Sequence, residues 1–315
     1  MSKVVYVVGS GGHNVYSAMT RVAVASVRLT NPETSILLAC DSITAAALKS
    51  RHDPLIGEVN ETIVCDAPSG TDAFRARFVK TQLRNLVDGP FLYLDSDTVV
   101  RKDLSELFSL DTDIACALNH SSDVFELQIL EKDRDDLARI GWKTRNDFYV
   151  NGGVVFYGDT TGARHLADDW HNKWLVSCKL TRECRDQPAL NAAIFNTQPI
   201  LMVLPHRYNA QLMCSPRTVV EASIWHYYAS AVDEPVSEFS VLVHKVLGGA
   251  ELRVCDVRTM VQSHHPWRRR FWIDDLIADR MIRKGRFSDE YAMWFEGHRM
   301  RSILHQLRNI AMGRI

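Results

Sequence analysis

Two carboxylates separated by one residue follow an apolar run near the end of the chain's first third. The run is Phe91 to Leu94, and Asp95-Ser96-Asp97 comes directly after it. Four bulky apolar residues in succession predict a strand buried on both faces, as in a parallel sheet covered by helices. Ionised carboxylates are costly to bury unpaired, so we expect Asp95 and Asp97 just beyond the strand's carboxyl end, where open α/β sheets bind ligands.

At that position Asp95 and Asp97 could hold one hard cation. Mg²⁺ and Mn²⁺ bind carboxylate oxygens and keep other positions free for the phosphate oxygens of a substrate. The alternative is a solvated turn that caps a helix starting near Leu104, because aspartate is also a favoured turn and cap residue. The two aspartates alone leave both interpretations open.

Other residues that could take part in ligand binding lie before and after this pair in the sequence. Arg75, Arg77 and Lys80 place cations on the predicted helix that leads into the Asp95 strand, where they could face a bound diphosphate or simply solvent. Asn151-Gly152-Gly153 begins another strand, and the two glycines would let a ligand approach the backbone or would form a bulge.

Two further positions carry polar groups in suggestive contexts. Asp186-Gln187-Pro188 places a carboxylate and an amide at a helix N-terminus, which could be a ligand site or an ordinary cap. His226 lies in an apolar, strand-like run, where histidine is commonly a hydrogen-bonded core residue but is also a frequent metal ligand.

The elements that must position these residues alternate between two types. Strand-like segments are predicted at residues 4–8, 35–40, 61–65, 91–94, 111–118 and 149–157, the last broken at Gly152-Gly153. Helices are predicted at 17–29, 43–50, 74–86, 163–175 and 187–195. This rhythm predicts an α/β fold with a doubly wound, mostly parallel, Rossmann-like sheet. The polar segment from Ser121 to Asp147 is expected to be less regular and to shape a second binding pocket.

Length and charge narrow the class of protein. A chain of 315 residues can form one large α/β domain with an appendage. With 37 basic and 38 acidic side chains the formal net charge is −1, so we expect no nucleic-acid partner. The apolar run after Lys3 is too short for a signal peptide, and no stretch approaches the roughly 18 apolar residues of a membrane span. We therefore expect a cytoplasmic protein.

The seven cysteines show no Cys-x-x-Cys pair and no zinc-ligand spacing, so we expect mostly buried thiols in a reducing compartment. They are Cys40, Cys65, Cys116, Cys178, Cys184, Cys214 and Cys255.

The residues from His264 onward differ in composition from the rest. They carry eleven Lys or Arg and six Asp or Glu side chains, interleaved with seven aromatic residues. Such a helical extension could lie on an anionic membrane surface, at the inner face of the cell membrane, or could pack its aromatic side chains onto the main domain. We expect a catalytic domain over residues 1–235 and a helical, basic and aromatic extension over 236–315.

In their order along the chain, these motifs resemble the GT-A-fold glycosyltransferases, and most closely glycosyltransferase family 8, which includes glycogenin and bacterial lipooligosaccharide galactosyltransferases. The resemblance covers roughly the first 230 residues. The segments that carry it are Asn14-Val15-Tyr16, Phe78-Val79-Lys80, Tyr93 to Thr98, Asn151 to Val154, Asp186 to Asn191 and Trp225-His226-Tyr227.

The resemblance implies a metal-dependent transferase. It would move a hexose from a nucleotide sugar, most often a UDP-sugar, to a glycan or glycolipid acceptor with retention of anomeric configuration. Mn²⁺ (or Mg²⁺) would be held by Asp95, Asp97 and His226. Asp186 and Gln187 would be the catalytic positions, Asp186 contacting the donor sugar and Gln187 lying opposite the leaving group. The donor site would comprise Asn14, Tyr16, Arg77, Lys80, Asp95, Ser96, Asn151, Gly152 and Gly153.

Two segments depart from expectation. Family members usually follow the metal-binding histidine with a lysine-containing segment that touches the diphosphate, whereas residues 227–235 read YYASAVDEP. The loop from Gly9 to Asn14 resembles a dinucleotide fingerprint without its final glycine, which keeps a Rossmann oxidoreductase as a minor alternative. A GT-A-like nucleotidyltransferase and a catalytically lapsed carbohydrate-binding protein also stay open as functions.

Overall fold

A computed structural model of the protein describes residues 2–9, 15–119, 129–211, 221–227, 237–263 and 266. Its main element is a seven-stranded sheet in the order β3-β2-β1-β4-β7-β6-β8. The strands are β1 (Lys3–Val8), β2 (Ser35–Asp41), β3 (Glu61–Cys65), β4 (Phe91–Leu94), β6 (Ile114–Leu118), β7 (Val150–Tyr157) and β8 (Leu201–Leu204). Strand β7 runs against its neighbours β4 and β6, and the other pairs in this sheet are parallel. The predicted mostly parallel sheet is confirmed.

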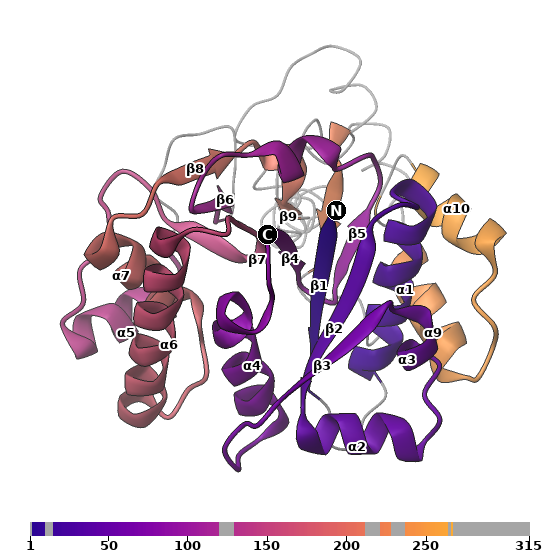
Figure 1. The fold of residues 1–315 in the computed structure, drawn as a ribbon, viewed down its shortest axis with the longest axis horizontal. Helices are drawn as coiled ribbons and strands as arrows, with labels where there is room; N and C mark the ends of the chain where they lie inside the picture. The colour runs from indigo at the N-terminus through magenta and orange to yellow at the C-terminus, as the bar shows by residue number, and fades with distance from the viewer. Residues whose placement is uncertain are drawn as a thin grey trace, which may run out of the picture.

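Helices cover both faces of this sheet, which confirms the doubly wound arrangement (Figure 1). One face carries α4 (Asp72–Leu86), α6 (Thr161–Thr181) and α7 (Gln187–Thr197), with α5 (Glu131–Ile140) beside α6 and α7. The other face carries α1 (Val15–Thr30), α2 (Ser42–Ser50), α3 (Leu55–Glu58) and the 3₁₀ turn η1 (Ser105–Ser109).

Alternation along the strands divides the core into two layers. Val4 and Tyr6 of β1 pack toward α1, whereas Val5 packs toward α4. The same division separates Leu92 and Leu94 from Phe91 and Tyr93 on β4. Because successive side chains of a strand point to opposite faces, an all-apolar segment fits a strand covered on both sides.

A second, three-stranded sheet lies beside the first. It contains β5 (Thr98–Val100), β10 (Ile224–His226) and β9 (Ala210–Gln211), in the order β5-β10-β9. The short turn η2 (His206–Tyr208) leads into β9. Strand β5 follows the two aspartates directly, so the small sheet begins where the chain leaves the carboxyl end of β4.

The helices α9 (Glu238–Leu247) and α10 (Val254–Gln262) pack on α1. Phe239, Val243 and Met260 share a buried cluster there with Met19 and Val22 of α1. The first part of the predicted extension therefore contacts the main domain directly. Residues 267–315, with the basic and aromatic side chains, lie outside the described part of the chain, and the boundary at residue 235 stays a prediction.

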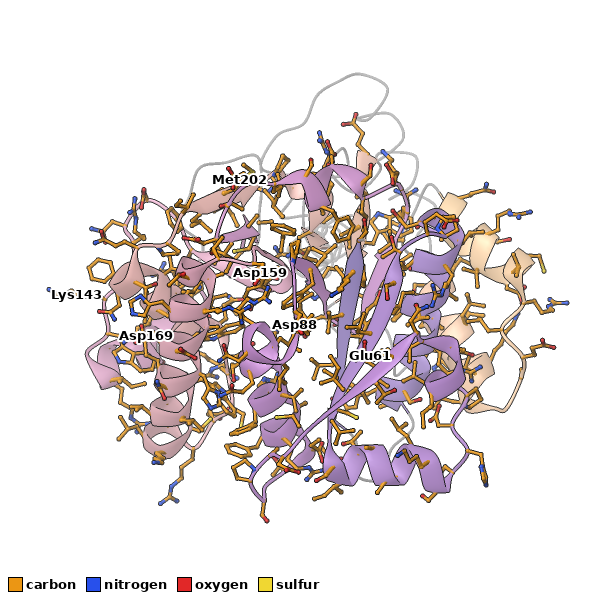
Figure 2. The ribbon with its side chains drawn as sticks, viewed as in Figure 1. Glu61, Asp88, Lys143, Asp159, Asp169 and Met202 are labelled. Atoms are coloured by element: carbon orange, nitrogen blue, oxygen red, sulfur yellow. The ribbon has the colours of Figure 1, made fainter. Side chains whose placement is uncertain are left out.

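Labelled side chains in Figure 2 show where the two edges and one end of the large sheet lie. Glu61 and Met202 lie on the two edge strands, β3 and β8. Asp88 precedes β4 and Asp159 follows β7, so both mark the end of the sheet opposite the carboxyl end of β4.

Strand β7 continues through Gly152-Gly153, but its pairing with β6 is irregular there, since Cys116 pairs with Val155 and Leu118 with Val150. The predicted break at the two glycines is thus an irregularity within one strand. Two other local predictions were wrong. The helix near Leu104 is the single 3₁₀ turn η1. Of the segment Ser121 to Asp147, expected to be less regular, residues 121–128 lie outside the described part and the rest contains the helix α5. The second binding pocket expected there stays a prediction.

Cysteine burial is more varied than predicted. Of the six cysteines in the described residues, Cys40 and Cys116 are buried, Cys255 is exposed and the other three are half-buried; all six are free thiols. Cys214 lies outside these residues. No helix in the described part combines the length and the apolar character needed to cross a membrane.

Candidate functional site

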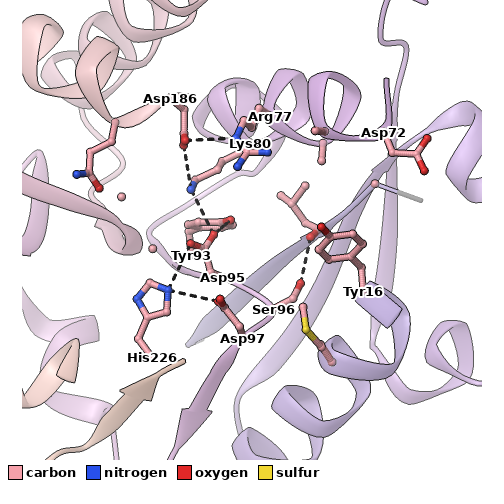
Figure 3. Close-up of a pocket in the computed structure, with 18 of the residues that line it drawn as sticks. Tyr16, Asp72, Arg77, Lys80, Tyr93, Asp95, Ser96, Asp97, Asp186 and His226 are labelled. Carbon is pink, nitrogen blue, oxygen red and sulfur yellow. Dashed lines mark hydrogen bonds and ion pairs between the residues drawn. The ribbon is translucent and has the colours of Figure 1, made fainter. Parts of the chain in front are cut away.

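A pocket of about 570 Å³ lies at the carboxyl ends of β1 and β4 (Figure 3). Twelve of the residues singled out in the sequence line it: Tyr16, Arg77, Lys80, Asp95, Ser96, Asp97, Asn151, Gly152, Gly153, Asp186, Gln187 and His226. Asn14 lies outside the described residues. The volume falls within the range of small-molecule sites in proteins.

The sheet order explains why these residues meet. The strand order reverses direction between β1 and β4, and ligands of open α/β sheets bind at such a switch point. Because β7 is antiparallel to β4, its first residues lie beside the last residues of β4. The backbone N–H of Asp95 accordingly donates to the carbonyl of Gly153 at 2.8 Å. Asn151, Gly152 and Gly153 thus reach the site from the start of a strand.

His226 reaches the same place through the small sheet. Strand β10 pairs antiparallel with β5, so that His226 lies opposite Thr98. The backbone N–H of Tyr227 then donates to the carbonyl of Asp97 at 2.9 Å. This register brings the imidazole beside the carboxylates.

Asp95, Asp97 and His226 form a compact cluster, with one potential ligand atom from each and all three atoms within 4.8 Å of one another. Nε2 of His226 lies 3.3 Å from Oδ1 of Asp97 and 3.8 Å from Oδ2 of Asp95. Burial lowers the pKa of His226, but the two carboxylates more than offset this effect and leave that pKa above its ordinary value.

The residues of this cluster fit a divalent cation. Two carboxylate oxygens and one imidazole nitrogen converge on one point, and Nδ1 of His226 is held 2.9 Å from Oδ1 of Asn209, which directs Nε2 toward the carboxylates. Gly153 allows this approach, because a Cβ atom there would lie 2.2 Å from Cε1 of His226 and 2.7 Å from Oδ2 of Asp95.

A second charged cluster faces the first across the pocket. Nζ of the buried Lys80 lies 2.9 Å from Oδ2 of Asp186 and 3.2 Å from Oδ1 of Asp95, and Arg77 lies 3.5 Å from the other oxygen of Asp186. Burial lowers the pKa of Lys80, but Asp186 and Asp95 raise it above its ordinary value. Lys80 is therefore a fixed cation that joins the two carboxylates.

The interpretation of Asp186 as an ordinary helix cap is wrong. Asp186 stands at the N-cap position of α7, but its side chain accepts no capping hydrogen bond. Its carboxylate instead faces Lys80 and Arg77 of α4 (Figure 3). An ion pair with a buried lysine replaces the local cap, which leaves the carboxylate on the pocket wall.

The remaining predicted residues differ in how they face the pocket. The Ser96 hydroxyl accepts from Thr20 at 2.8 Å and donates to the carbonyl of Val7 at 3.3 Å. Tyr16 is exposed on the first turn of α1. Arg75, by contrast, does not line the pocket and pairs with Asp41 and Asp72.

Two residues with direct contacts to the clusters did not stand out in the sequence. The Tyr93 hydroxyl donates a hydrogen bond to Asp95, and Lys80 lies 4.9 Å above the Tyr93 ring. Since Tyr93 and Asp95 are two residues apart at the end of a strand, period-two alternation could have placed both on one face. Asn209 has no such local signal, because its partners are distant in the sequence.

Comparison with solved structures places this arrangement in a known architecture. The galactosyltransferase LgtC, solved in complex with donor and acceptor sugar analogs, aligns over 80% of this chain and 97% of its own with a TM-score of 0.51 and 16% identity. An active-site mutant of LgtC covers the same shares with a TM-score of 0.50 and 14% identity. The chain has a GT-A glycosyltransferase fold.

The GT-A fold predicted from the sequence is thus confirmed. No protein-family model matches the sequence, and no match was found among curated proteins. At 14% and 16% identity the likeness establishes the GT-A fold, so activity has to be argued from the residues of the pocket.

Proposed function

We propose that the protein is a divalent-metal-dependent glycosyltransferase that transfers a hexose from a nucleotide sugar, a UDP-sugar, to a glycan or glycolipid acceptor. The observation that carries this proposal is the convergence of Asp95, Asp97 and His226 at the carboxyl end of β4, in a GT-A fold. A cation held there would face open pocket volume where a diphosphate could complete its coordination. Mn²⁺ suits the mixed oxygen and nitrogen donor set, and Mg²⁺ is the alternative.

Breaking the bond between an anomeric carbon and a diphosphate leaves negative charge on the departing group. When bound, the cation would supply the positive charge that stabilises this group. Lys80 would add a second cation to the site and would hold Asp186 and Asp95 at fixed positions. Asp186 would then accept hydrogen bonds from hydroxyls of the donor sugar.

Gln187 would lie beside the anomeric carbon. An amide is a poor nucleophile, and its Oε1 already accepts a hydrogen bond from Asn151 at 3.1 Å. Gln187 would therefore stabilise positive charge in the transition state rather than form a covalent intermediate. Retention of configuration at the anomeric carbon would then require the acceptor to attack from the face that the diphosphate leaves. Asp186 is the stronger nucleophile of the two by residue type.

We further propose that the acceptor is a glycan or lipid-linked sugar at the inner face of the membrane, approached through the basic and aromatic residues after His264. The full chain is expected to sediment with vesicles that contain anionic lipid, and a chain ending at residue 263 is expected to stay in solution. Equal sedimentation of the two would contradict this role for the extension.

Isothermal titration with UDP tests the donor site. We expect UDP to bind in the presence of Mn²⁺ and its affinity to fall at least about 100-fold with a chelator, because the diphosphate would lose its principal counter-charge. An equal affinity for UDP with and without the chelator would contradict the proposal. Among nucleotide sugars that bind, hydrolysis or transfer distinguishes an enzyme from a lapsed binding protein, and pyrophosphate release from a nucleoside triphosphate would indicate a nucleotidyltransferase instead.

A further inference from the structure

A chain of buried side-chain amides connects the proposed cation site to the catalytic position. Asn209, fully buried after the turn η2, lies with Oδ1 2.9 Å from Nδ1 of His226, and its Nδ2 donates to Oδ1 of Asn151 at 2.9 Å. Nδ2 of Asn151 in turn donates to Oε1 of Gln187 at 3.1 Å. His226 and Gln187, which come from different elements, are thereby joined through two asparagines.

The backbone N–H of Gly153 sets the donor-to-acceptor direction of the hydrogen bonds that link these side-chain amides. The N–H of Gly153 can only donate, and it donates to Asn151 at 2.9 Å. The atom of Asn151 that faces Gly153 must therefore be the oxygen. Asn209, which contacts the same oxygen, must present its NH₂ group there and its own oxygen toward His226.

The orientation of the Asn209 amide decides the tautomer of His226. An oxygen at 2.9 Å from Nδ1 requires that Nδ1 carry the hydrogen, so in the neutral ring the lone pair lies on Nε2. Nε2 is the nitrogen that faces Asp97 and Asp95. The imidazole thus presents its acceptor atom to the point where the carboxylates converge.

The orientation of the Asn151 amide also fixes the orientation of Gln187, at the other end of this series of hydrogen bonds. With its oxygen occupied by Gly153 and Asn209, Asn151 has two hydrogens left, and they meet Oδ1 of Asn119 at 3.2 Å and Oε1 of Gln187 at 3.1 Å. The carbonyl end of Gln187 is thereby held toward Asn151. A reversed Asn209 would break this pattern at its centre.

We propose that Asn209 is a positioning residue: it fixes the Nδ1–H tautomer of His226 for cation binding and, through Asn151, the orientation of the Gln187 amide. This inference rests on the proposed cation site. It assigns two separable tasks to one side chain, an acceptor task toward His226 and a donor task toward Asn151.

The two tasks can be separated by substitution. N209A removes both, whereas the nearly isosteric N209D keeps an oxygen facing His226 and loses the donor to Asn151. We expect N209A to bind Mn²⁺ about 10- to 100-fold more weakly than the unmodified protein, as for other lost partners of metal-binding histidines. We expect N209D to restore affinity to within about threefold of the original while kcat for transfer stays at least about tenfold low.

Free Mn²⁺ is measured by electron paramagnetic resonance as metal is added to the protein without any nucleotide. The matched control is N31A, since Asn31 is also buried and makes three side-chain hydrogen bonds, but to Thr30, Lys102 and Leu104 away from the pocket. N31A is expected to lower the melting temperature and leave the Mn²⁺ affinity unchanged.

Three results would overturn the inference: N209A that binds Mn²⁺ like the unmodified protein, N209D that binds as weakly as N209A, or a loss of affinity matched by N31A. Absence of Mn²⁺ binding by the unmodified protein would overturn it as well. If Mn²⁺ binding depends on Asn209 but no nucleotide sugar binds, the inference holds and the proposed transferase function fails.

Discussion

D97A is expected to reduce glycosyl transfer by at least roughly 10³-fold, which corresponds to about 4 kcal/mol of lost transition-state stabilisation. Asp97 is the carboxylate nearest to His226, at 3.3 Å, and it is almost completely buried. Its removal leaves one carboxylate and one imidazole, too few protein ligands to hold a cation firmly. The measurements are initial rates with a nucleotide sugar and titration of UDP in the presence of Mn²⁺.

The control for this experiment is D88A. Asp88 is an exposed aspartate before β4, at the opposite end of the sheet (Figure 2). D88A should transfer sugar and bind UDP like the unmodified protein. Equal activity of D97A and D88A would remove Asp97 from the proposed site.

G153A is expected to be the most damaging change that adds a single methyl group to this pocket. The new Cβ would lie 2.2 Å from His226 and 2.7 Å from Asp95, so at least one proposed ligand must move. We expect Mn²⁺ affinity to fall about 100-fold, since displacements near 1 Å at an active site have effects of that size. Overpacking should also cost about 1–3 kcal/mol of stability.

The adjacent glycine provides the comparison. In G152A the added Cβ would lie 3.5 Å from Leu190 and 3.8 Å from Lys80, which are ordinary contacts. We expect G152A to keep Mn²⁺ affinity within about threefold of the original, because neither imidazole nor carboxylate has to move. The same metal titration is used for both variants. Similar losses in G152A and G153A would show that the strand as a whole, rather than the clash with His226, controls the affinity.

The parts of the fold that follow local rules could be predicted from the sequence. The bounds of β4 agree with the predicted strand because Phe91 to Leu94 are apolar on both faces and the next residue is charged. Helix α4 was expected two residues short at its start, since the Thr71 cap lies before the first apolar residue of the pattern. Buried strands and amphipathic helices of this length carry their signal within a few residues.

The run around His226 was predicted to be strand-like and forms β10, but the small sheet as a whole could not be predicted in the same way. Strands β5, β9 and β10 have two or three residues each, too few to show a period, and their pairing joins residues 98–100 to residues 224–226. The contacts of Asn209 could not be predicted either, because its partners His226 and Asn151 are distant in the sequence. Asp186 shows the opposite case, where a good local cap pattern was overridden by the buried cation of Lys80.

The reversed strand β7 also constrains how the protein is made. It enters the sheet between β4 and β6, although both are synthesised before it, and β10 comes later still. A chain emerging from the ribosome therefore carries Asp95 and Asp97 long before His226, and such long-range pairings are formed slowly. The imidazole joins the carboxylates only once β10 has paired with β5. Metal acquisition is thus expected after synthesis of the domain, as one of its last assembly steps.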